Sequence, residues 1–571
     1  YKTVTRNVTL KKGKTLEEDF EIEEDAIALD GVVVSANRSE TTRRMAPTLV
    51  NVVDLKLFET TNSSTLSQGL NFQPGVRVET NCQNCGFQQV RINGLDGPYT
   101  QILIDSRPVF SALSGVYGLE QIPASMIERV EVMRGGGSAL FGSSAIAGTI
   151  NIITKEPLRN SGQLSHTITS LGGSSSFDNN TSLNASLVTD DHRAGLYIFG
   201  QNRYRSGYDY DGDGFTELPK LKNQTVGFRS YLKTSTYSKL TFEYHHMQEF
   251  RRGGDMLNRP PHEAHIAEQL QHSIDGGSLK FDYFSPDEKN RLSVFASAAN
   301  TDRDSYYGPG NDPLKAYGKT TDLTAMGGAQ YVHTFDKCFF MPSDLTAGLE
   351  YNRDRLKDNM WGYNRHTDQT VNIYSAFLQN EWKNDRWGIL IGGRLDKHNM
   401  VDNVIFSPRA NLRFNPTQNI NLRLSYSSGF RAPQAFDEDM HIENVGGTVA
   451  MIERAKDLKE EKSQSFSVSA DMYHRFGAFQ TNLLIEGFYT RLTDVFVLGK
   501  PYDRGDGILV KTRSNGPGAK VMGLTLEGKV AYLSILQIQA GLTLQRSRYD
   551  EPHKWHDDAP AEKKIFRTPD T

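Results

Sequence analysis

The most regular feature of the chain is an alternation of apolar and polar positions that begins near Ser161 and continues to the end. The segments TNLLIEGFYT, GLTLEGKVAY and LQIQAGLTLQRSRY show it. In LRLSYSSGF, one face carries Leu422, Leu424 and Tyr426 and the other carries Arg423, Ser425 and Ser427. A period of two with one apolar face is typical of membrane-barrel strands, whose outer face meets lipid and whose inner face lines a polar lumen.

Short and long connections join these segments. NPTQN and DKHNM are short, whereas Arg251–His265 and Tyr502–Pro517 are long and polar. Outer-membrane barrels combine short turns on one side of the membrane with long loops on the other, and about 400 residues hold on the order of twenty strands with their connections. A soluble β-sandwich or propeller is the alternative, but no blade-length repeat is visible.

The residues before this region have a different composition and pattern. Between about Leu29 and Pro157, glycines and turn residues separate short strand-like runs such as VRINGL, TQILIDSRPVF, IERVEVMRG and GTINIITKEP. This pattern predicts a compact α+β domain, in which Ser125–Glu128 forms a helical turn that starts at Pro123. Residues 1–24 contain one or two further strand-like runs, TVTRNVTL and DFEIEE.

Composition narrows the class of protein. The 571 residues are only 37 % hydrophobic, with a mean hydropathy of -0.52, whereas soluble domains are nearer half apolar. No run approaches the ~18 apolar residues of a membrane-spanning helix. The 24 Tyr and 29 Phe are too many for a disordered chain. We therefore expect a transmembrane antiparallel β-barrel, because its polar lumen lowers the average hydropathy.

Charge and motifs exclude several functions. A formal net charge of -4, from 64 basic and 68 acidic residues, gives no support to nucleic-acid binding. No GxSxG elbow, HExxH helix or Walker loop is present, so we expect no enzyme and no catalytic cofactor. Three cysteines exclude a four-thiolate zinc site within the chain. An adhesive or structural outer-membrane barrel is a function that these exclusions leave open.

A series of motifs in the glycine-rich region resembles a known family. In order, they are VVVSANRSE, APTLVNVVD, LNFQPGVRV, VRINGL, ILIDSRPV, IPASMIERVEVMRG and SALFGSSAIAGTINIITKEP. From about Asp30 to Pro157 they resemble the plug domain of TonB-dependent outer-membrane transporters. The family usually has Gly where Ser106 stands and often has Pro where Gly136 stands. Residues 1–24 resemble the end of the carboxypeptidase-like regulatory domain that precedes many such plugs.

The resemblance implies an architecture and a location. It implies a β-barrel of about 22 strands when complete, with the C-terminal strands missing here, that holds the α+β plug in its lumen. The barrel would lie in the outer membrane, in contact with its lipid. The divisions would be the regulatory-domain end at 1–24, a TonB-box segment and linker at 25–45, the plug at 46–157 and the barrel at 158–571.

The segment DGVVVSAN resembles the TonB box, on which the TonB protein and its inner-membrane motor complex act. Its valines form an extended β-branched run that is able to add as a strand to the sheet edge of a partner. An ordinary plug strand is the alternative. The expected box residues are Asp30, Gly31, Val32, Val33, Val34, Ser35 and Ala36.

An acidic loop follows an early barrel strand in GYDYDGDGFTELP. Carboxylates at alternate positions gather oxygen ligands for calcium in many loops, although this one is not a complete EF-hand. A solvated acidic loop is the alternative. The cobalamin branch of the family has a similar loop, in which calcium orders the substrate-binding surface, and this resemblance favours calcium. The candidate ligands are Asp209, Asp211, Asp213 and Glu217.

Two loops are expected to meet substrate at the plug apex. In TNCQNCGF, the spacing of Cys82 and Cys85 predicts a disulfide in the oxidising cell envelope; a metal-binding or redox-active pair and two free thiols are the alternatives. The second loop, FSALSGVY, is small and apolar, which suits a bulky ligand. The expected binding residues are Asn81, Cys82, Gln83, Asn84, Cys85, Phe110, Ser111, Leu113 and Tyr117.

One histidine follows the block FRAP at Phe430–Pro433. Haem transporters of the family have a histidine between such a block and an NPDL-like block, which AKDLKEE matches only loosely. We include His441 among the substrate-binding residues, and an exposed loop histidine is the alternative. His262, His265 and His272 form another group, which suits either metal or haem binding or a polar loop.

These features predict TonB-dependent import of a scarce nutrient. Cobalamin is the first candidate, because the VVVSANR start and the acidic loop resemble the cobalamin branch. Haem or a ferric siderophore is the alternative. A surface lipoprotein that caps the barrel is a further expected partner, since such partners are common where a regulatory domain precedes the plug.

Overall fold

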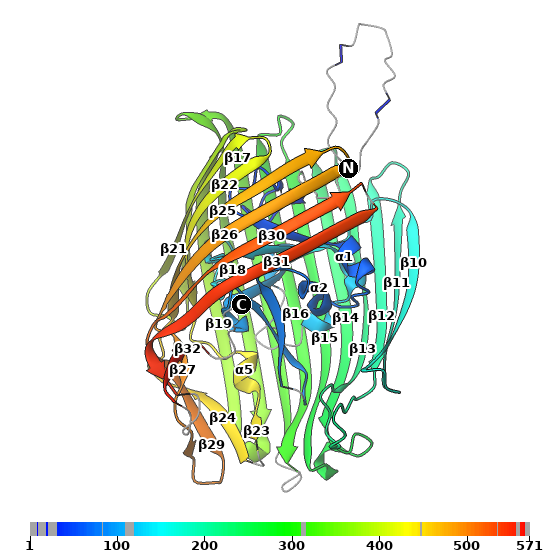
Figure 1. Ribbon diagram of the computed structural model, residues 1–571, viewed down its shortest axis with the longest axis vertical. Coiled ribbons are helices and arrows are strands. Elements are labelled where there is room, and N and C mark those ends of the chain that lie inside the picture. Colours follow the sequence, from blue (N-terminus) through cyan, green and yellow to red (C-terminus); the bar gives the residue numbers. More distant parts are fainter. Residues whose placement is uncertain are drawn as a thin grey trace.

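The computed structural model describes residues 8–9, 19–20, 31–82, 84–108, 119–309, 316–445, 448–533, 535–554 and 560–565. Most of the expected regulatory-domain end at 1–24 therefore lies outside the described residues, as do Asp30, Gln83, Phe110, Ser111, Leu113 and Tyr117. Figure 1 shows a tall β-barrel that surrounds a smaller mixed domain.

The barrel wall is one antiparallel sheet. Within the described residues it has 18 strands in chain order, which confirms the predicted fold class. They are β10 (Ser161–Ser170), β11 (Phe177–Val188), β12 (Ala194–Arg205), β13 (Lys220–Ser235), β14 (Ser238–Gly254), β15 (Ile266–Phe284), β16 (Asn290–Pro309), β17 (Tyr317–Cys338), β18 (Met341–Met360), β19 (Arg365–Lys383), β20 (Trp387–His398), β21 (Ile405–Thr417), β22 (Ile420–Arg431), β25 (Glu461–Phe476), β26 (Phe479–Thr493), β30 (Ala519–Tyr532), β31 (Leu536–His553) and β32 (Glu562–Lys564).

The alternation in the sequence corresponds to the two faces of this wall. On β22, Leu424 is 53 % exposed on the outer face, whereas its neighbour Arg423 is 3 % exposed and faces inwards. Other strands also bury charged side chains on the inner face, such as Glu249 and Arg303. An apolar outer surface around a polar interior is the arrangement that a barrel in a lipid bilayer requires.

The two ends of the barrel differ. At the end nearest the N label in Figure 1, short turns join the strands, such as residues 236–237 between β13 and β14. The opposite end has long connections, and short turns face the periplasm in outer-membrane barrels while long loops face the exterior. The connections at this end carry η3 (Pro261–Glu263), η4 (Trp361–Tyr363), α5 (Asp437–Met440), β23 (Glu443–Val445), β24 (Thr448–Arg454), β27 (Phe496–Leu498), β28 (Tyr502–Asp503) and β29 (Leu509–Asn515).

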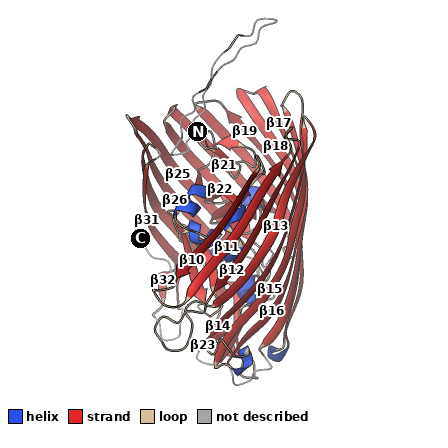
Figure 2. Ribbon diagram, turned by 90° about the vertical axis from the view of Figure 1, so that its right-hand side faces the viewer, coloured by secondary structure: helices blue, strands red, loops and turns tan. Residues whose placement is uncertain are grey.

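The plug centres on a five-stranded mixed sheet in the order β3-β8-β9-β6-β7. Figure 2 shows its helices enclosed by the barrel strands. Among the described helices, none is long and apolar enough to cross a membrane. The elements are β1 (Val32–Val33), β2 (Thr41–Thr42), β3 (Val50–Asp54), α1 (Leu55–Thr60), α2 (Leu66–Leu70), β4 (Val76–Cys82), β5 (Phe87–Ile92), η1 (Gly97–Tyr99), β6 (Thr100–Ile104), β7 (Arg107–Pro108), η2 (Ala124–Met126), β8 (Ile127–Arg134), α4 (Ser138–Phe141) and β9 (Gly148–Thr154).

The helical turn predicted at Ser125–Glu128 is shorter than expected. Pro123 precedes it as predicted, but η2 ends at Met126, and β8 begins at Ile127. Ile127 is fully buried and pairs with Thr154 of β9, so the pairing of the sheet ends the helical turn early.

Buried ion pairs attach the plug to the barrel wall. Arg134, at the end of β8, places Nη2 2.8 Å from Glu486 on β26 and 2.9 Å from Glu527 on β30. Glu120 of the plug pairs with Arg205 on β12 at 2.7 Å and with Arg251 on β14 at 2.9 Å. Charges at this depth are tolerated because each faces an opposite charge.

We predict that Arg134→Ala loosens the plug without disturbing the barrel. Removing one partner of a buried ion pair costs about 3–5 kcal/mol, because the remaining charge stays buried. Limited proteolysis of the purified protein should cut the plug faster, while thermal unfolding of the barrel should stay unchanged. Lys289→Ala, which breaks an exposed pair with Asp336, is the control and should alter neither measurement. Wild-type protease resistance in Arg134→Ala would contradict this role.

Candidate functional site

The hairpin of β4 and β5 ends in a tight turn that carries Cys82 and Cys85. Cys82 pairs with Phe87 across the hairpin, and its carbonyl accepts a hydrogen bond from the Gly86 N–H at 3.0 Å. Gly86 has a φ of 69°, in the left-handed region that favours glycine. This turn is the hairpin tip, residues 82–87, at the extracellular end of the plug.

The barrel wall holds the hairpin tip at close range. Arg251 on β14 donates a hydrogen bond from Nη1 to the Gly86 carbonyl at 3.3 Å, and Glu249 pairs with the same guanidinium at 2.7 Å. Gly253 lies further along β14, and a Cβ there would lie 1.8 Å from the carbonyl oxygen of Asn84. The missing side chain therefore lets the hairpin tip reach the wall.

Glu268 comes from β15, beside the hairpin tip. It pairs with Gly253 on β14 and with Tyr307 on β16. On β15 it lies on the same face as buried Leu270, whereas Gln271 is exposed, so Glu268 faces the lumen. Its side chain is 3 % exposed. A buried carboxylate in this position requires a partner of opposite charge or strong hydrogen-bond donors.

His441 follows α5 in the connection between β22 and β25. Its neighbours Met440 and Ile442 are buried. Arg365 donates a hydrogen bond from Nη2 to the Met440 carbonyl at 3.0 Å, which fixes the backbone before the histidine. The His441 side chain is 17 % exposed, so it is not an exposed loop histidine.

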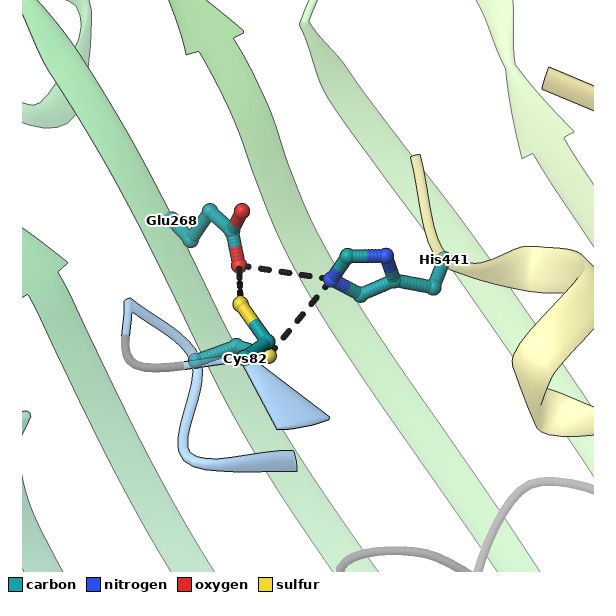
Figure 3. A group of neighbouring side chains, drawn as sticks. Cys82, Glu268 and His441 are labelled. Atoms are coloured by element: carbon teal, nitrogen blue, oxygen red, sulfur yellow. Dashed lines mark hydrogen bonds and ion pairs between the residues drawn. The ribbon is translucent and has the colours of Figure 1, made fainter. Parts of the chain in front are cut away.

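Cys82, Cys85, Glu268 and His441 converge, and Figure 3 shows three of them with the ribbons that carry them. Cys82 Sγ lies 3.3 Å from Glu268 Oε2, and His441 Nε2 lies 3.5 Å from the same oxygen. Cys85 Sγ lies 3.5 Å from His441 Nε2. One donor atom from each residue lies within 4.8 Å of all the others. We call these four residues the thiol–imidazole cluster.

The electrostatics of the cluster favour charged side chains. A hydrogen bond from Cys85, opposed by burial and by the charge of Glu268, lowers the pKa of the Cys82 thiol to about 6. Burial on its own lowers the pKa of His441, but the Glu268 carboxylate and Cys82 outweigh it and raise that pKa to about 10. Each group of the cluster therefore changes the pKa of its neighbours.

Aromatic side chains enclose the imidazole. The rings of Phe87 and Tyr307 meet that of His441 edge-on, with centroids 5.8 and 5.4 Å from it. Tyr363 of η4 donates a hydrogen bond from its hydroxyl to the Tyr307 carbonyl at 2.6 Å, which ties this wall to an extracellular connection. Buried Met451 belongs to the same apolar cluster. The histidine thus has one defined orientation.

The disulfide predicted between Cys82 and Cys85 is not formed in the structure. Both sulfurs instead take part in polar contacts with residues from other parts of the chain, because Cys82 lies beside Glu268 and Cys85 lies beside His441. Among the alternatives, a pair of free thiols and a metal-binding pair agree with this geometry.

Three of the four cluster residues belong to the binding set predicted from the sequence, and Glu268 does not. Its position as an inward-facing acid near the extracellular end of a strand was the available signal. Asn84 lies in the hairpin tip, while the side chain of Asn81 is outside the described part. The other histidines of this region lie apart from the cluster: His262 contacts the Tyr317 hydroxyl at 2.8 Å, His265 pairs with Asp255 at 2.6 Å, and His272 lies 3.5 Å from Glu249.

The acidic loop also gathers its carboxylates. One oxygen each from Asp209, Asp211, Asp213 and Glu217 lies within 4.8 Å of the others. Asp209 accepts hydrogen bonds from the N–H groups of Gly212 and Gly214 at 2.7 and 2.9 Å. Pro219 follows the loop, and a Cβ on Gly86 would lie 3.0 Å from its Cγ. The loop therefore ends beside the hairpin tip with an oxygen-only donor set, of the kind that calcium prefers.

The expected TonB-box segment lies at the periplasmic end. Only Val32–Val33 is extended, paired with Thr41–Thr42, and residues 34–39 fold back in turns. The predicted extended run is therefore too long. The cause is Glu131 on β8, because its Oε2 accepts the N–H groups of Val34 and Ser35 at 2.9 and 2.8 Å and the Ser35 hydroxyl at 2.7 Å.

Comparison with known proteins gives two family matches. The TonB-dependent receptor plug domain matches residues 42–149, and the TonB-dependent receptor-like β-barrel matches residues 149–571. The chain is 24 % identical over 425 residues to the vitamin B12 transporter BtuB of Vibrio vulnificus strain CMCP6, covering 72 % of this chain and 64 % of the relative. BtuB of strain YJ016 is 33 % identical over 174 residues, 29 % of this chain and 28 % of the relative. The chain thus spans less than two thirds of either relative.

Solved structures share the fold at low identity. The siderophore receptor PirA of Pseudomonas aeruginosa has a TM-score of 0.70 and 16 % identity, covering 88 % of this chain and 85 % of that one. A mutant of the ferric enterobactin receptor PfeA from the same organism has a TM-score of 0.72 and 18 % identity, covering 88 % and 80 %. The barrel places the protein in the outer membrane. With a barrel match that spans most of its length, this chain belongs to the TonB-dependent receptor family.

Proposed function

We propose that this protein imports a bulky nutrient across the outer membrane and that the TonB protein, with its inner-membrane motor complex, supplies the energy. The observation that carries the proposal is the placement of two segments at opposite ends of one plug. The hairpin tip lies against an extracellular connection through His441 and against the extracellular end of β15 through Glu268. The segment Gly31–Ala36 lies at the periplasmic end, where Asn37 bonds Glu381 of β19 at 2.7 Å.

Coupling requires that Gly31–Ala36 leaves the plug. Val33 and Ser35 are fully buried, so neither backbone group is accessible to a partner strand in this conformation. Once the bonds to Glu131 are broken, the β-branched run is free to add to the sheet edge of TonB. Rearrangement of the plug then opens a path through the lumen, and no covalent chemistry is required.

Cobalamin is the nutrient that we propose first. The two curated relatives named above are vitamin B12 transporters. The acidic loop supports the same substrate, because its four carboxylates converge in a loop whose end, at Pro219, lies beside the hairpin tip. Calcium in this loop would order the extracellular surface on which a large ligand rests. Haem and ferric siderophores are the alternatives that a binding panel must include.

The TonB-box assignment is tested by Val33→Pro. Proline removes the backbone N–H that strand addition needs, so uptake of the nutrient by cells should be lost while binding to the purified protein is retained. Because Val33 is also buried against Ala46 and Val50, Val33→Ala is the control. It loses packing but keeps the N–H, and it should retain most of the uptake. Normal uptake by Val33→Pro would refute the assignment.

The cobalamin proposal is tested through calcium. If both ligands use one ordered surface, each must strengthen the binding of the other by the same factor, about 5–150-fold for typical couplings. Asp211→Asn with Asp213→Asn should lower cobalamin affinity and abolish its response to a calcium chelator, as measured by equilibrium binding.

Asp190→Asn with Glu288→Gln is the matched control, because it removes two exposed carboxylates at the periplasmic end. It should bind cobalamin as the wild type does. Equally tight cobalamin binding in all variants, with and without chelator, would remove calcium from the mechanism. Binding of haemin or a ferric siderophore in place of cobalamin would change the substrate.

A further inference from the structure

We propose that the thiol–imidazole cluster binds a single thiophilic transition-metal ion, zinc or copper(I), and that this ion is a further cargo of the transporter. The inference rests on the proposed import activity and adds a class of cargo to it. The binding of the ion does not depend on whether cobalamin is the other nutrient.

The donor set points to this class of metal. Cys82 and Cys85 supply two sulfurs at a spacing of three residues, which is common in zinc sites. His441 adds an imidazole nitrogen and Glu268 a carboxylate oxygen. Thiolates select zinc and copper(I) over magnesium and calcium, which prefer oxygen ligands. The acidic loop nearby has no sulfur or nitrogen donor, so the two groups differ in the ions that they suit.

Three of the six separations between donor atoms already match a coordination shell. A tetrahedral ion with bonds of about 2.0–2.3 Å holds its donors about 3.3–3.8 Å apart. The separations between Cys82 and Glu268, Glu268 and His441, and Cys85 and His441 are 3.3, 3.5 and 3.5 Å. Small side-chain rotations are therefore sufficient to seat an ion among the four donors.

The contacts of the Glu268 carboxylate lie within the thiol–imidazole cluster. In the described part of the chain, neither arginine nor lysine forms an ion pair with it, and its carboxylate contacts Cys82 and His441. The edge-on rings of Phe87 and Tyr307 hold the imidazole with Nε2 towards the sulfurs. Preorganised ligands in a largely buried site bind an ion with little loss of side-chain freedom.

The origin of the four ligands argues for cargo. Two come from the plug, one from the barrel wall and one from an extracellular connection. A plug that moves during transport separates the two sulfurs from the other two ligands, and the site then binds the ion far more weakly. Because a ligand stabilises the state that it binds best, the ion favours the closed plug and is released when the plug rearranges.

The binding test uses the full-length protein, reduced and freed of metal. Zinc and copper(I) are each titrated in competition with a coloured chelator, and cobalt(II) is added as a probe whose absorption reports thiolate ligation. We expect one ion per chain. Loss of a group that merely orients a ligand costs about 10–100-fold in metal affinity, so loss of a ligand should cost at least as much.

Matched variants locate the site. Cys82→Ser with Cys85→Ser should abolish the cobalt–thiolate absorption, and Glu268→Gln should weaken binding with little change in shape. The controls are Cys338→Ser, at a periplasmic turn, and Glu263→Gln, an exposed acid of η3. Both should bind as the wild type does. Unchanged affinity in the cluster variants, or mass spectrometry showing that Cys82 and Cys85 resist alkylation as a disulfide in freshly isolated protein, would overturn the site.

Cell uptake separates this inference from the proposed function. Accumulation of radioactive zinc or copper should require the protein, and both Val33→Pro and the double serine variant should abolish it. If cobalamin enters in a manner that depends on Val33 but the ions do not, the cargo inference fails while the import proposal stands. If the ions, cobalamin, haemin and ferric siderophores all fail to enter, import itself fails, whatever the purified protein binds.

Discussion

The pairing of charges buried between plug and barrel is the constraint on which the rest of the structure depends. A lumen lined with polar side chains can be filled by a folded domain only if each buried charge meets a partner. Arg134 meets Glu486 and Glu527 at one contact, and Glu120 meets Arg251 at another. Arg251 also donates to the Gly86 carbonyl, so the network that docks the plug also sets the position of the hairpin tip. The thiol–imidazole cluster is therefore a product of docking and not of the hairpin alone.

The sequence predicts those features that depend on local periodicity. Alternation such as that around Arg423 gives barrel strands with assigned faces, and a motif series gives the plug. Features that depend on contacts between distant strands are not predictable in this way. Glu268 joins the two cysteines only because β14 and β15 pair in one register and Gly253 leaves space. The spacing of Cys82 and Cys85 permits a disulfide, but what each sulfur faces is decided by parts of the chain far away in sequence.

The extracellular end of the barrel carries two groups of potential metal ligands that differ in chemical hardness. The acidic loop offers carboxylates, and the thiol–imidazole cluster offers sulfur and nitrogen, with the contact of Pro219 and Gly86 between them. If both proposed sites bind ions, hard and soft cations have separate places on one surface. This separation fits a receptor whose extracellular face depends on one ion for order while its apex discriminates among metals.

The hydrogen bonds from Val34 and Ser35 to Glu131 have a mechanical consequence. A single oxygen, Oε2, accepts all three hydrogen bonds from Val34 and Ser35, although the carboxylate lies 97 residues from Val34 in the chain. Asn151 of β9 and Arg409 of β21 hold the same segment, through hydrogen bonds to the Ser35 hydroxyl at 3.0 Å and to the Ala36 carbonyl at 2.9 Å. A pull on the segment therefore acts at the same time on β8 through Glu131, on β9 through Asn151 and on the barrel wall through Arg409. Since β8 and β9 are neighbours in the plug sheet, the pull reaches the centre of that sheet.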